Sequence, residues 1–179
     1  MNNYKDIKLF FAKTKPDAII PTKNVEDAGR DVYACFEEDY LIIPPHTTVM
    51  IPTGIASSFS VEFYGQLFER GSTGTKGMIQ HSGVIDSGFR GEWVVPIGNG
   101  NEYPIVIIKK DSKTTKGELL VKLAVIGYTE PPAFYPYEKA ICQVVFLPVP
   151  QLEQHEISLE QLKAIPSKRG AGKLGSSGK

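Results

Sequence analysis

The chain has 179 residues, of which 41% are hydrophobic, so its length and composition suit a single domain with one ordinary core. Twenty lysines and arginines balance twenty aspartates and glutamates, and the resulting net charge of zero argues against a broad positive surface for DNA or RNA. The sequence shows neither a signal peptide nor a stretch of roughly 20 apolar residues that could cross a membrane, so we expect a soluble, cytoplasmic protein.

Short runs rich in Val, Ile, Tyr and Phe, each bounded by Gly, Pro, Asn or Asp, predict β-strands along most of the chain. In chain order these runs are residues 7–12, 31–36, 40–43, 47–51, 59–68, 92–97, 105–109, 119–128 and 140–149. Regular turns and the lack of a long helical period predict an all-β barrel or jelly roll.

The second half of the chain holds three less regular segments. Residues 109–122 contain five lysines and two acidic residues, which we interpret as the solvated tip of a hairpin rather than a polyanion site. Residues 131–136 (PPAFYP) predict an extended connector. Ser158 and Gln161 match a capping box and precede apolar residues at helical spacing, which predicts one short helix.

The cysteines and histidines suggest no metal site. Cys35 and Cys142 match no metal-ligand spacing and lie in apolar runs, so we expect reduced core thiols. His46, His81 and His155 are dispersed, which argues against a histidine-ligated zinc site and a Ser-His-Asp triad.

Asp86 is the first candidate for chemistry, because it follows a predicted strand and precedes Ser87 and Gly88. Asp-Ser-Gly is also ordinary turn chemistry, so a purely structural role is the alternative. A carboxylate held rigidly at a strand end can take a proton from water as a general base.

Two Gly-rich segments with arginine could surround a phosphate. Residues 70–77 (RGSTGTKG) combine an arginine fork with hydroxyls and unhindered backbone N–H groups, but their spacing is not that of a Walker A loop. Residues 169–179 hold four glycines, two lysines and Arg169, and too little apolar surface to fold alone. A surface loop and an unstructured tail are the alternatives. Asp31 is either a turn residue or a group that orients a metal-bound water.

Taken in order, five segments resemble the motifs of the trimeric all-β deoxyuridine triphosphatase (dUTPase) family. They are residues 27–32 (DAGRDV), 70–76 (RGSTGTK), 83–91 (GVIDSGFRG), 139–144 (KAICQV) and 169–178 (RGAGKLGSSG). The third segment is the most specific one, and five matches in the same order are a strong signal.

The resemblance implies a distorted jelly-roll barrel that hydrolyses dUTP to dUMP and pyrophosphate and so keeps uracil out of DNA. Asp86 would activate a water that attacks the α-phosphorus, and Mg²⁺ would bridge the triphosphate with indirect help from Asp31. The implied domain covers residues 1–166, with an inserted β-extension at roughly 98–138, and residues 167–179 would form a mobile phosphate-binding arm.

The resemblance also implies which residues bind the substrate. They are Arg70, Gly71, Ser72, Gln80, Gly83, Val84, Ile85, Phe89, Val94, Gln143, Arg169, Leu174, Gly175 and Ser176. In the implied homotrimer, Arg70 would hold the phosphates from one subunit, Gln143 from a neighbour and Arg169 from a third. The hairpin of residues 80–85 would read uracil through its backbone.

Several positions depart from the family pattern. Gly71 and Ser72 stand where Ser-Gly is usual, and Phe89 stands where tyrosine is common. Ala140 replaces a frequent arginine, and Leu174 replaces the phenylalanine that stacks on the base.

Two other functions fit parts of this pattern. A dCTP deaminase of related fold needs a glutamate where Pro96 stands here, and Glu92 lies too close to the turn. A dUTP-gated binding protein would use the extension at 98–138 to dock a protein regulator.

Overall fold

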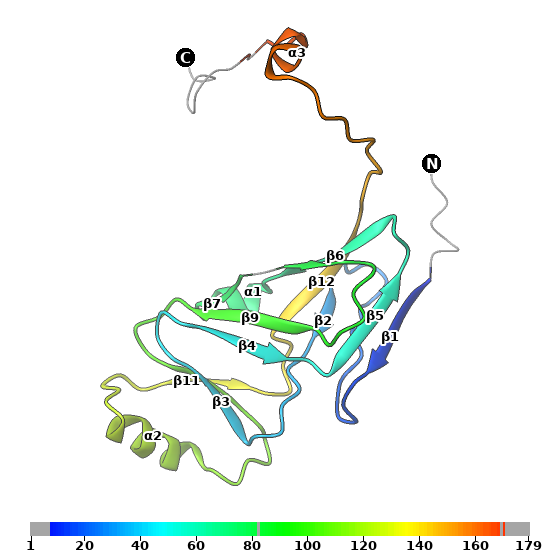
Figure 1. Ribbon diagram of the computed structural model, residues 1–179. Coiled ribbons are helices and arrows are strands. Elements are labelled where there is room, and N and C mark those ends of the chain that lie inside the picture. The colour runs from blue at the N-terminus through cyan, green and yellow to red at the C-terminus, as the bar shows by residue number, and fades with distance from the viewer. Residues whose placement is uncertain (1–7, 82, 169, 171–179) are drawn as a thin grey trace. The chain divides into compact units, whose positions relative to one another are not determined.

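The computed structural model describes residues 8–81, 83–168 and 170. Contacts divide the chain into a unit that ends at Val149 and a smaller unit that begins at Pro150. The first unit contains every strand of the described chain, and the second contains one helix, α3 (Leu159–Ala164) (Figure 1). Most of the predicted arm, Arg169 and residues 171–179, lies outside the described residues.

The strands form four small sheets, as expected for an all-β protein (Figure 1). The strands are β1 (Leu9–Lys13), β2 (Arg30–Val32), β3 (Tyr40–Ile43), β4 (Thr48–Pro52), β5 (Ile55–Phe59), β6 (Phe63–Phe68), β7 (Met78–Gln80), β8 (Val84–Ile85), β9 (Val94–Asn99), β10 (Ile105–Ile108), β11 (Ala133–Pro136) and β12 (Cys142–Pro148). Their orders are β1-β5, β11-β10-β3, β2-β12-β6-β8 and β4-β9-β7. In these sheets the strands pair antiparallel, except that β10 and β11 are parallel.

The main core lies between these sheets and is built from alternating strand residues. On β5, Ile55 and Phe59 are buried while the residues between them alternate in exposure. The single tryptophan, Trp93, is fully buried and meets Phe11 edge to face at 5.6 Å. Cys35 and Cys142 are buried and unpaired, which confirms the prediction of reduced core thiols.

Several predicted elements are confirmed, and others are shortened: the strand expected at 59–68 is interrupted at residues 60–62 and continues only as β6. The strand expected at 40–43 is β3, and the short helix expected after Ser158 is α3, with the capping box in place. Of the strand expected at 31–36, only β2 forms. Residues 34–36 do not pair with a neighbouring strand. The chain turns away from the sheet after β2, and the side chains of these residues pack into the core. None of the described helices is long and apolar enough to cross a bilayer.

The strand predicted over residues 119–128 is wrong, because a helix, α2 (Lys116–Val125), occupies that part of the chain. The hairpin tip predicted over 109–122 is wrong for the same reason. Thr115 caps the helix: its hydroxyl accepts from the Glu118 N–H at 3.2 Å, and the Glu118 carboxylate accepts from the Thr115 N–H at 2.7 Å. The Thr115 N–H and hydroxyl both donate to the Glu118 carboxylate, and these two hydrogen bonds lower the pKa of Glu118.

The predicted extension at 98–138 therefore contains a β10-α2-β11 crossover rather than strands alone (Figure 1). Leu119 and Leu123, one turn apart on α2, are buried against Val106 and Ile108 of β10. This second apolar cluster holds α2 on one face of the β11-β10-β3 sheet. A parallel strand pair needs such a crossover, which explains why a helix forms here.

Burial raises the acid pKa values of three groups in the first unit. It raises the pKa of Tyr137 to about 12 and also raises that of Tyr135. It raises the pKa of the Cys142 thiol in the same way, and the nearby Asp31 carboxylate adds to the effect. The folded protein therefore holds these protons more tightly than the unfolded chain does.

We predict that stability falls with alkaline pH through these groups. Between about pH 10 and about pH 12 the unfolded chain loses tyrosine protons that the folded protein keeps, so the free energy of unfolding declines as the pH rises. Urea unfolding at a series of pH values measures this decline. Tyr137→Phe should make the decline shallower than in the unchanged protein, and equal slopes for the two proteins would contradict the assignment.

Candidate active site

A polar pocket of about 490 Å³ gathers residues from three of the five sequence segments. It is lined by Thr22, Lys23, Asn24, Asp27, Ala28, Gly29, Asp31, Arg70 and Gln143. Asp31 lies on β2, Gln143 lies on β12, and Arg70 follows the end of β6. The sheet order β2-β12-β6 is what brings them together, because β12 lies between the other two strands.

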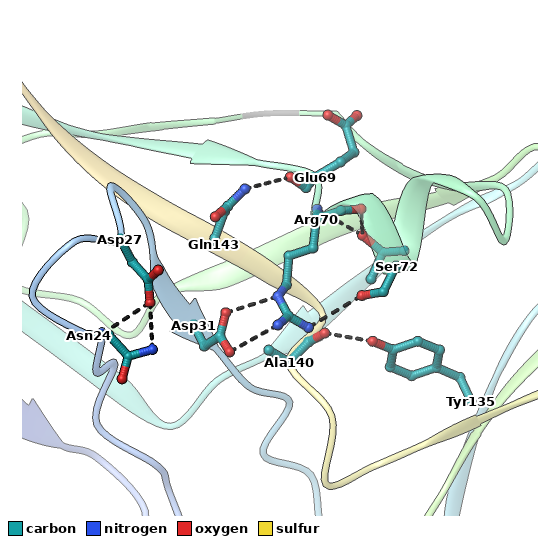
Figure 2. A network of polar contacts seen from close by, with 10 residues as sticks. Asn24, Asp27, Asp31, Glu69, Arg70, Ser72, Tyr135, Ala140 and Gln143 are labelled. Carbon is teal, nitrogen blue, oxygen red and sulfur yellow. Dashed lines mark hydrogen bonds and ion pairs between the residues drawn. The ribbon is translucent and has the colours of Figure 1, made fainter.

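Arg70 and Asp31 form a two-pronged ion pair in this pocket (Figure 2). Arg70 Nε lies 2.9 Å from Asp31 Oδ1, and Arg70 Nη2 lies 3.1 Å from Asp31 Oδ2. Both side chains are about one-third exposed, at 30% and 33%. The pair fixes the direction of the guanidinium and leaves part of its five N–H donors for an anion.

The turn after Arg70 is fixed by Thr73. The buried Thr73 hydroxyl donates to the Arg70 carbonyl and accepts from the Arg70 N–H, each at 2.9 Å. Gly71 begins the short helix α1 (Gly71–Gly74), and the Ser72 hydroxyl accepts a long hydrogen bond from Arg70 Nη1 at 3.4 Å (Figure 2). Ser72 thus lies beside the arginine, as a shared phosphate site would require.

Gln143 lies beside Arg70 in the same chain, whereas the resemblance implied that it reaches the phosphates from a neighbouring subunit. Gln143 on β12 pairs with Phe68 at the end of β6, and its Nε2 donates to the Glu69 carbonyl at 2.9 Å (Figure 2). Gly29 faces it, since a Cβ at Gly29 would lie 2.2 Å from Gln143 Oε1. A side chain at position 29 would therefore displace the Gln143 side chain from its present place.

Sequence reasoning missed the cation that supports the loop at this pocket. Lys23 Nζ donates to the carbonyls of Asn24, Val25 and Asp27 at 2.9, 3.1 and 2.6 Å. The Asp27 carboxylate in turn accepts from the Asn24 side chain at 2.8 Å. Lys23 stands four residues before Asp27, and a lysine so close to the first segment was the available signal.

Tyr135 lies beneath the ion pair and was also missed. Its side chain is 1% exposed, and its hydroxyl donates to the Ala140 carbonyl at 2.6 Å (Figure 2). Arg70 and Ser72 both act on the pKa of this phenol by charge or hydrogen bonding, against the larger effect of burial. No sequence pattern connects residues 135 and 70, because the contact depends on the whole fold.

A second pocket of about 310 Å³ contains Asp86. It is lined by Leu67, Val84, Ile85, Asp86, Phe89, Glu92, Trp93 and Val94. Asp86 directly follows β8, and its side chain is exposed and makes no ion pair or hydrogen bond with any other residue in the described ranges. The pocket therefore combines one available carboxylate with apolar walls, of which Val84, Phe89 and Val94 are open to solvent.

Gln80 and Gly83 lie outside the lining of both pockets. The Gln80 N–H donates to the Glu69 carboxylate at 3.0 Å, and the Gly83 carbonyl accepts from the Leu67 N–H at 2.7 Å. A Cβ at Gly83 would lie 2.3 Å from Gln66 Nε2, so this position favours glycine. Ser82, directly before Gly83, lies outside the described ranges, as do Arg169, Leu174, Gly175 and Ser176.

The two pockets have no lining residue in common. One can hold an anion, and the other can hold an apolar ring beside a carboxylate. Among residues 8–81, 83–168 and 170, no group of three or more His, Cys, Asp or Glu side chains could bind a metal alone. Mg²⁺ typically keeps several waters and uses one or two carboxylates plus phosphates, which fits Asp27 and Asp31 beside Arg70.

Comparison with known proteins identifies the family. A dUTPase family model matches residues 15–113. The chain belongs to the dUTPase family. The deoxyuridine 5'-triphosphate nucleotidohydrolase of Leptospira interrogans is 30% identical over 105 residues, 56% of this chain and 72% of that protein. The Wolbachia pipientis enzyme of the same name is 28% identical over 175 residues, 96% of this chain and 93% of that protein.

Solved dUTPase structures have the same all-β, jelly-roll-like fold. A variant of the Staphylococcus bacteriophage 80alpha dUTPase with dUpNHpp has a TM-score of 0.66 at 22% identity, covering 96% of this chain and 99% of that chain. A variant of the dUTPase of phage phi11 of S. aureus, which coordinates a structural Mg(II) ion, has a TM-score of 0.62 at 18% identity, covering 84% and 96%.

Glu92, the residue considered for a deaminase, has a structural role in this dUTPase fold. Its Oε1 accepts from the Gly54 N–H at 2.9 Å, and its Oε2 accepts from the Thr14 hydroxyl at 3.1 Å. Both carboxylate oxygens are thus occupied by contacts to distant segments. This geometry leaves Glu92 poorly placed to relay protons to a base.

We predict that Glu92→Ala lowers the free energy of unfolding by about 1–3 kcal/mol, because it leaves the partly buried Gly54 N–H without its acceptor. Urea unfolding gives the value. Glu102→Ala is the matched control, since Glu102 is exposed and pairs only with the exposed His46, and its cost should stay below about 0.5 kcal/mol. Equal costs for the two variants would refute the structural role of Glu92.

Proposed function

We propose that this protein hydrolyses dUTP to dUMP and pyrophosphate, with Asp86 as the general base. Membership of the dUTPase family supports the reaction. The observation that carries the assignment of the base is the pocket in which Asp86 is an exposed carboxylate among apolar walls, without a polar partner among the described residues. In this reaction Asp86 takes the proton of a water, the water oxygen bonds to the α-phosphorus, and pyrophosphate leaves.

The apolar walls around Asp86 suit the nucleoside part of the substrate. Val84 and Phe89 are both partly exposed at the pocket mouth, and Ile85 is buried behind them. We propose that Val84 and Ile85 pack against deoxyribose and that the Phe89 ring blocks a ribose 2′-hydroxyl. The backbone of residues 80–85, including Gln80 and Gly83, would select uracil.

The polar pocket suits the triphosphate. Arg70 would bind phosphate oxygens through the N–H donors that Asp31 does not occupy, with Ser72, Gly71 and Gln143 beside it. Mg²⁺ would be held by the phosphates and waters, with Asp31 acting through water, and it would offset the negative charge of the triphosphate. Arg169, Leu174, Gly175 and Ser176 would close over the nucleotide.

The separation of the two pockets supports the homotrimer with shared sites that the sequence motifs imply. Asp86 and Arg70 line different pockets of one chain, although one dUTP must meet both. We propose that the Asp86 pocket of one subunit faces the Arg70 pocket of another. Because Gln143 lies in the pocket of Arg70, these two residues would come from the same subunit.

The test of this function is a kinetic comparison of the unchanged protein with Asp86→Asn. The unchanged protein with Mg²⁺ should release pyrophosphate from dUTP and no ammonia from dCTP. Asp86→Asn should lower kcat by about 100- to 10,000-fold while it still binds a non-hydrolysable dUTP analogue, because the amide cannot accept the proton.

Asp111→Asn is the matched control, since Asp111 lies in an exposed turn that lines neither nucleotide pocket, and its kcat should stay within about twofold of the unchanged protein. Near-native turnover by Asp86→Asn would remove Asp86 from the reaction. Ammonia release from dCTP would replace the proposed function with deamination.

We infer a second role for the extension, the docking of a protein regulator. Leu120, Val121 and Val125 on α2 and Ile126 directly after it are exposed, with Val121 at 65% and Val125 at 80% exposure. Large exposed apolar side chains gathered on one short segment are a feature of protein-binding surfaces. The structurally similar dUTPase of Staphylococcus bacteriophage 80alpha is one of the phage dUTPases that control transfer of virulence genes.

We predict that a double variant, Val121→Glu with Val125→Glu, loses a regulator while it keeps dUTP hydrolysis within about twofold, because neither residue lines a nucleotide pocket. The measurement is capture of partners from host extract, with and without a dUTP analogue, followed by binding of the purified partner. Val61→Glu, also exposed but outside the extension, is the control. Equal binding by the double variant and the control would end this proposal.

A further inference from the structure

Tyr135 connects the extension to the phosphate pocket. It lies on β11, the strand that follows α2, and it pairs in parallel register with Ile107 of β10. Its phenol reaches out of the extension and donates to the carbonyl of Ala140, which lies two residues before the start of β12. One buried hydroxyl therefore joins a strand of the extension to the strand that carries Gln143.

The two faces of β11 contact different parts of the protein. Phe134 packs against the cluster that contains Leu119 and Leu123 of α2. Its neighbour Tyr135 points to the other side, into the main core and toward the Arg70 guanidinium (Figure 2). Because successive strand residues face opposite ways, a shift of β11 would move both contacts together.

We propose that Tyr135 is a positioning residue for Arg70, through which the extension sets the place of the guanidinium that binds phosphate. Asp31 fixes the guanidinium from the β2 side, and the Tyr135 hydroxyl points toward it from the β11 side, where it bonds to the Ala140 carbonyl (Figure 2). The Tyr135 hydroxyl is bonded to the Ala140 carbonyl, and Arg70, Asp31 and Ser72, all of them part of the phosphate site, act on the pKa of the phenol.

The protonation of the phenol suits this role. Burial raises the pKa of Tyr135, so the phenol keeps its proton at neutral pH and can donate it to the Ala140 carbonyl. A neutral hydroxyl can support the guanidinium without cancelling its charge. A second carboxylate at the same place would compete with the phosphates.

The inference rests on the proposed function, because it assumes that Arg70 meets the phosphates of dUTP. Tyr135→Phe removes only the hydroxyl and should lower kcat/KM for dUTP by about tenfold, the size expected when one buried hydrogen bond, that to the Ala140 carbonyl, is lost. Tyr137→Phe is the matched control, because the Tyr137 ring packs edge to face on Phe36 at 4.9 Å. The groups that influence its phenol are Cys35, Phe36 and Asp17, which lie outside the phosphate site. Its kcat/KM should stay within about twofold of the unchanged protein.

A double-mutant cycle separates positioning from general stability. In an Arg70→Lys background, which keeps the charge but loses the fork, Tyr135→Phe should lower kcat/KM by less than about threefold. An equal loss in both backgrounds would overturn the proposal, and so would a loss no larger than that of Tyr137→Phe. Thermal unfolding of each variant shows that the compared proteins are folded.

A measurement on folded protein without turnover keeps the test independent of the reaction. With 3-fluorotyrosine placed at position 135 alone, inorganic pyrophosphate should shift the ¹⁹F resonance, whereas the same label at position 137 should not respond. A response at 135 without dUTP hydrolysis by the unchanged protein would support the positioning role and reject the proposed function. Active protein with no response at 135 would reject the positioning role alone.

Discussion

The pairing of β12 between β2 and β6 is the constraint on which the phosphate pocket depends. In its register, Gln143 stands opposite Asp31 on one side and Phe68 on the other. Arg70 follows two residues after Phe68, so the same strand alignment delivers the arginine to its carboxylate. A slip of one residue would turn every side chain of β12 to the opposite face and would separate these groups.

Sequence patterns predicted the parts of this protein that depend on local chemistry. The alternation and turn residues gave β3 and most other strands, and the capping box at Ser158 gave α3. The apolar run from Leu119 to Val125 is ambiguous, because a short buried helix and a buried strand have the same hydrophobic content. The Thr115 and Glu118 pair resolves the ambiguity in favour of a helix.

Contacts between distant residues could not be predicted from local pattern. Arg70 and Asp31 are 39 positions apart, and nothing in either segment alone indicates that they pair. The family resemblance indicated that both belong to one site, but it did not indicate that Asp31 would hold the arginine directly. Lys23 and Tyr135 were missed because their roles arise from a loop closure and a crossover that only the folded chain defines.

The burial of both cysteines has a practical meaning for work on this protein. Cys35 is 4% exposed and Cys142 is fully buried, and the raised pKa of Cys142 leaves it almost wholly as the unreactive thiol. An alkylating reagent can therefore reach Cys142 only after the sheet that contains β12 has opened. The rate at which Cys142 is alkylated therefore reports how often β12, the strand that organises the phosphate pocket, opens.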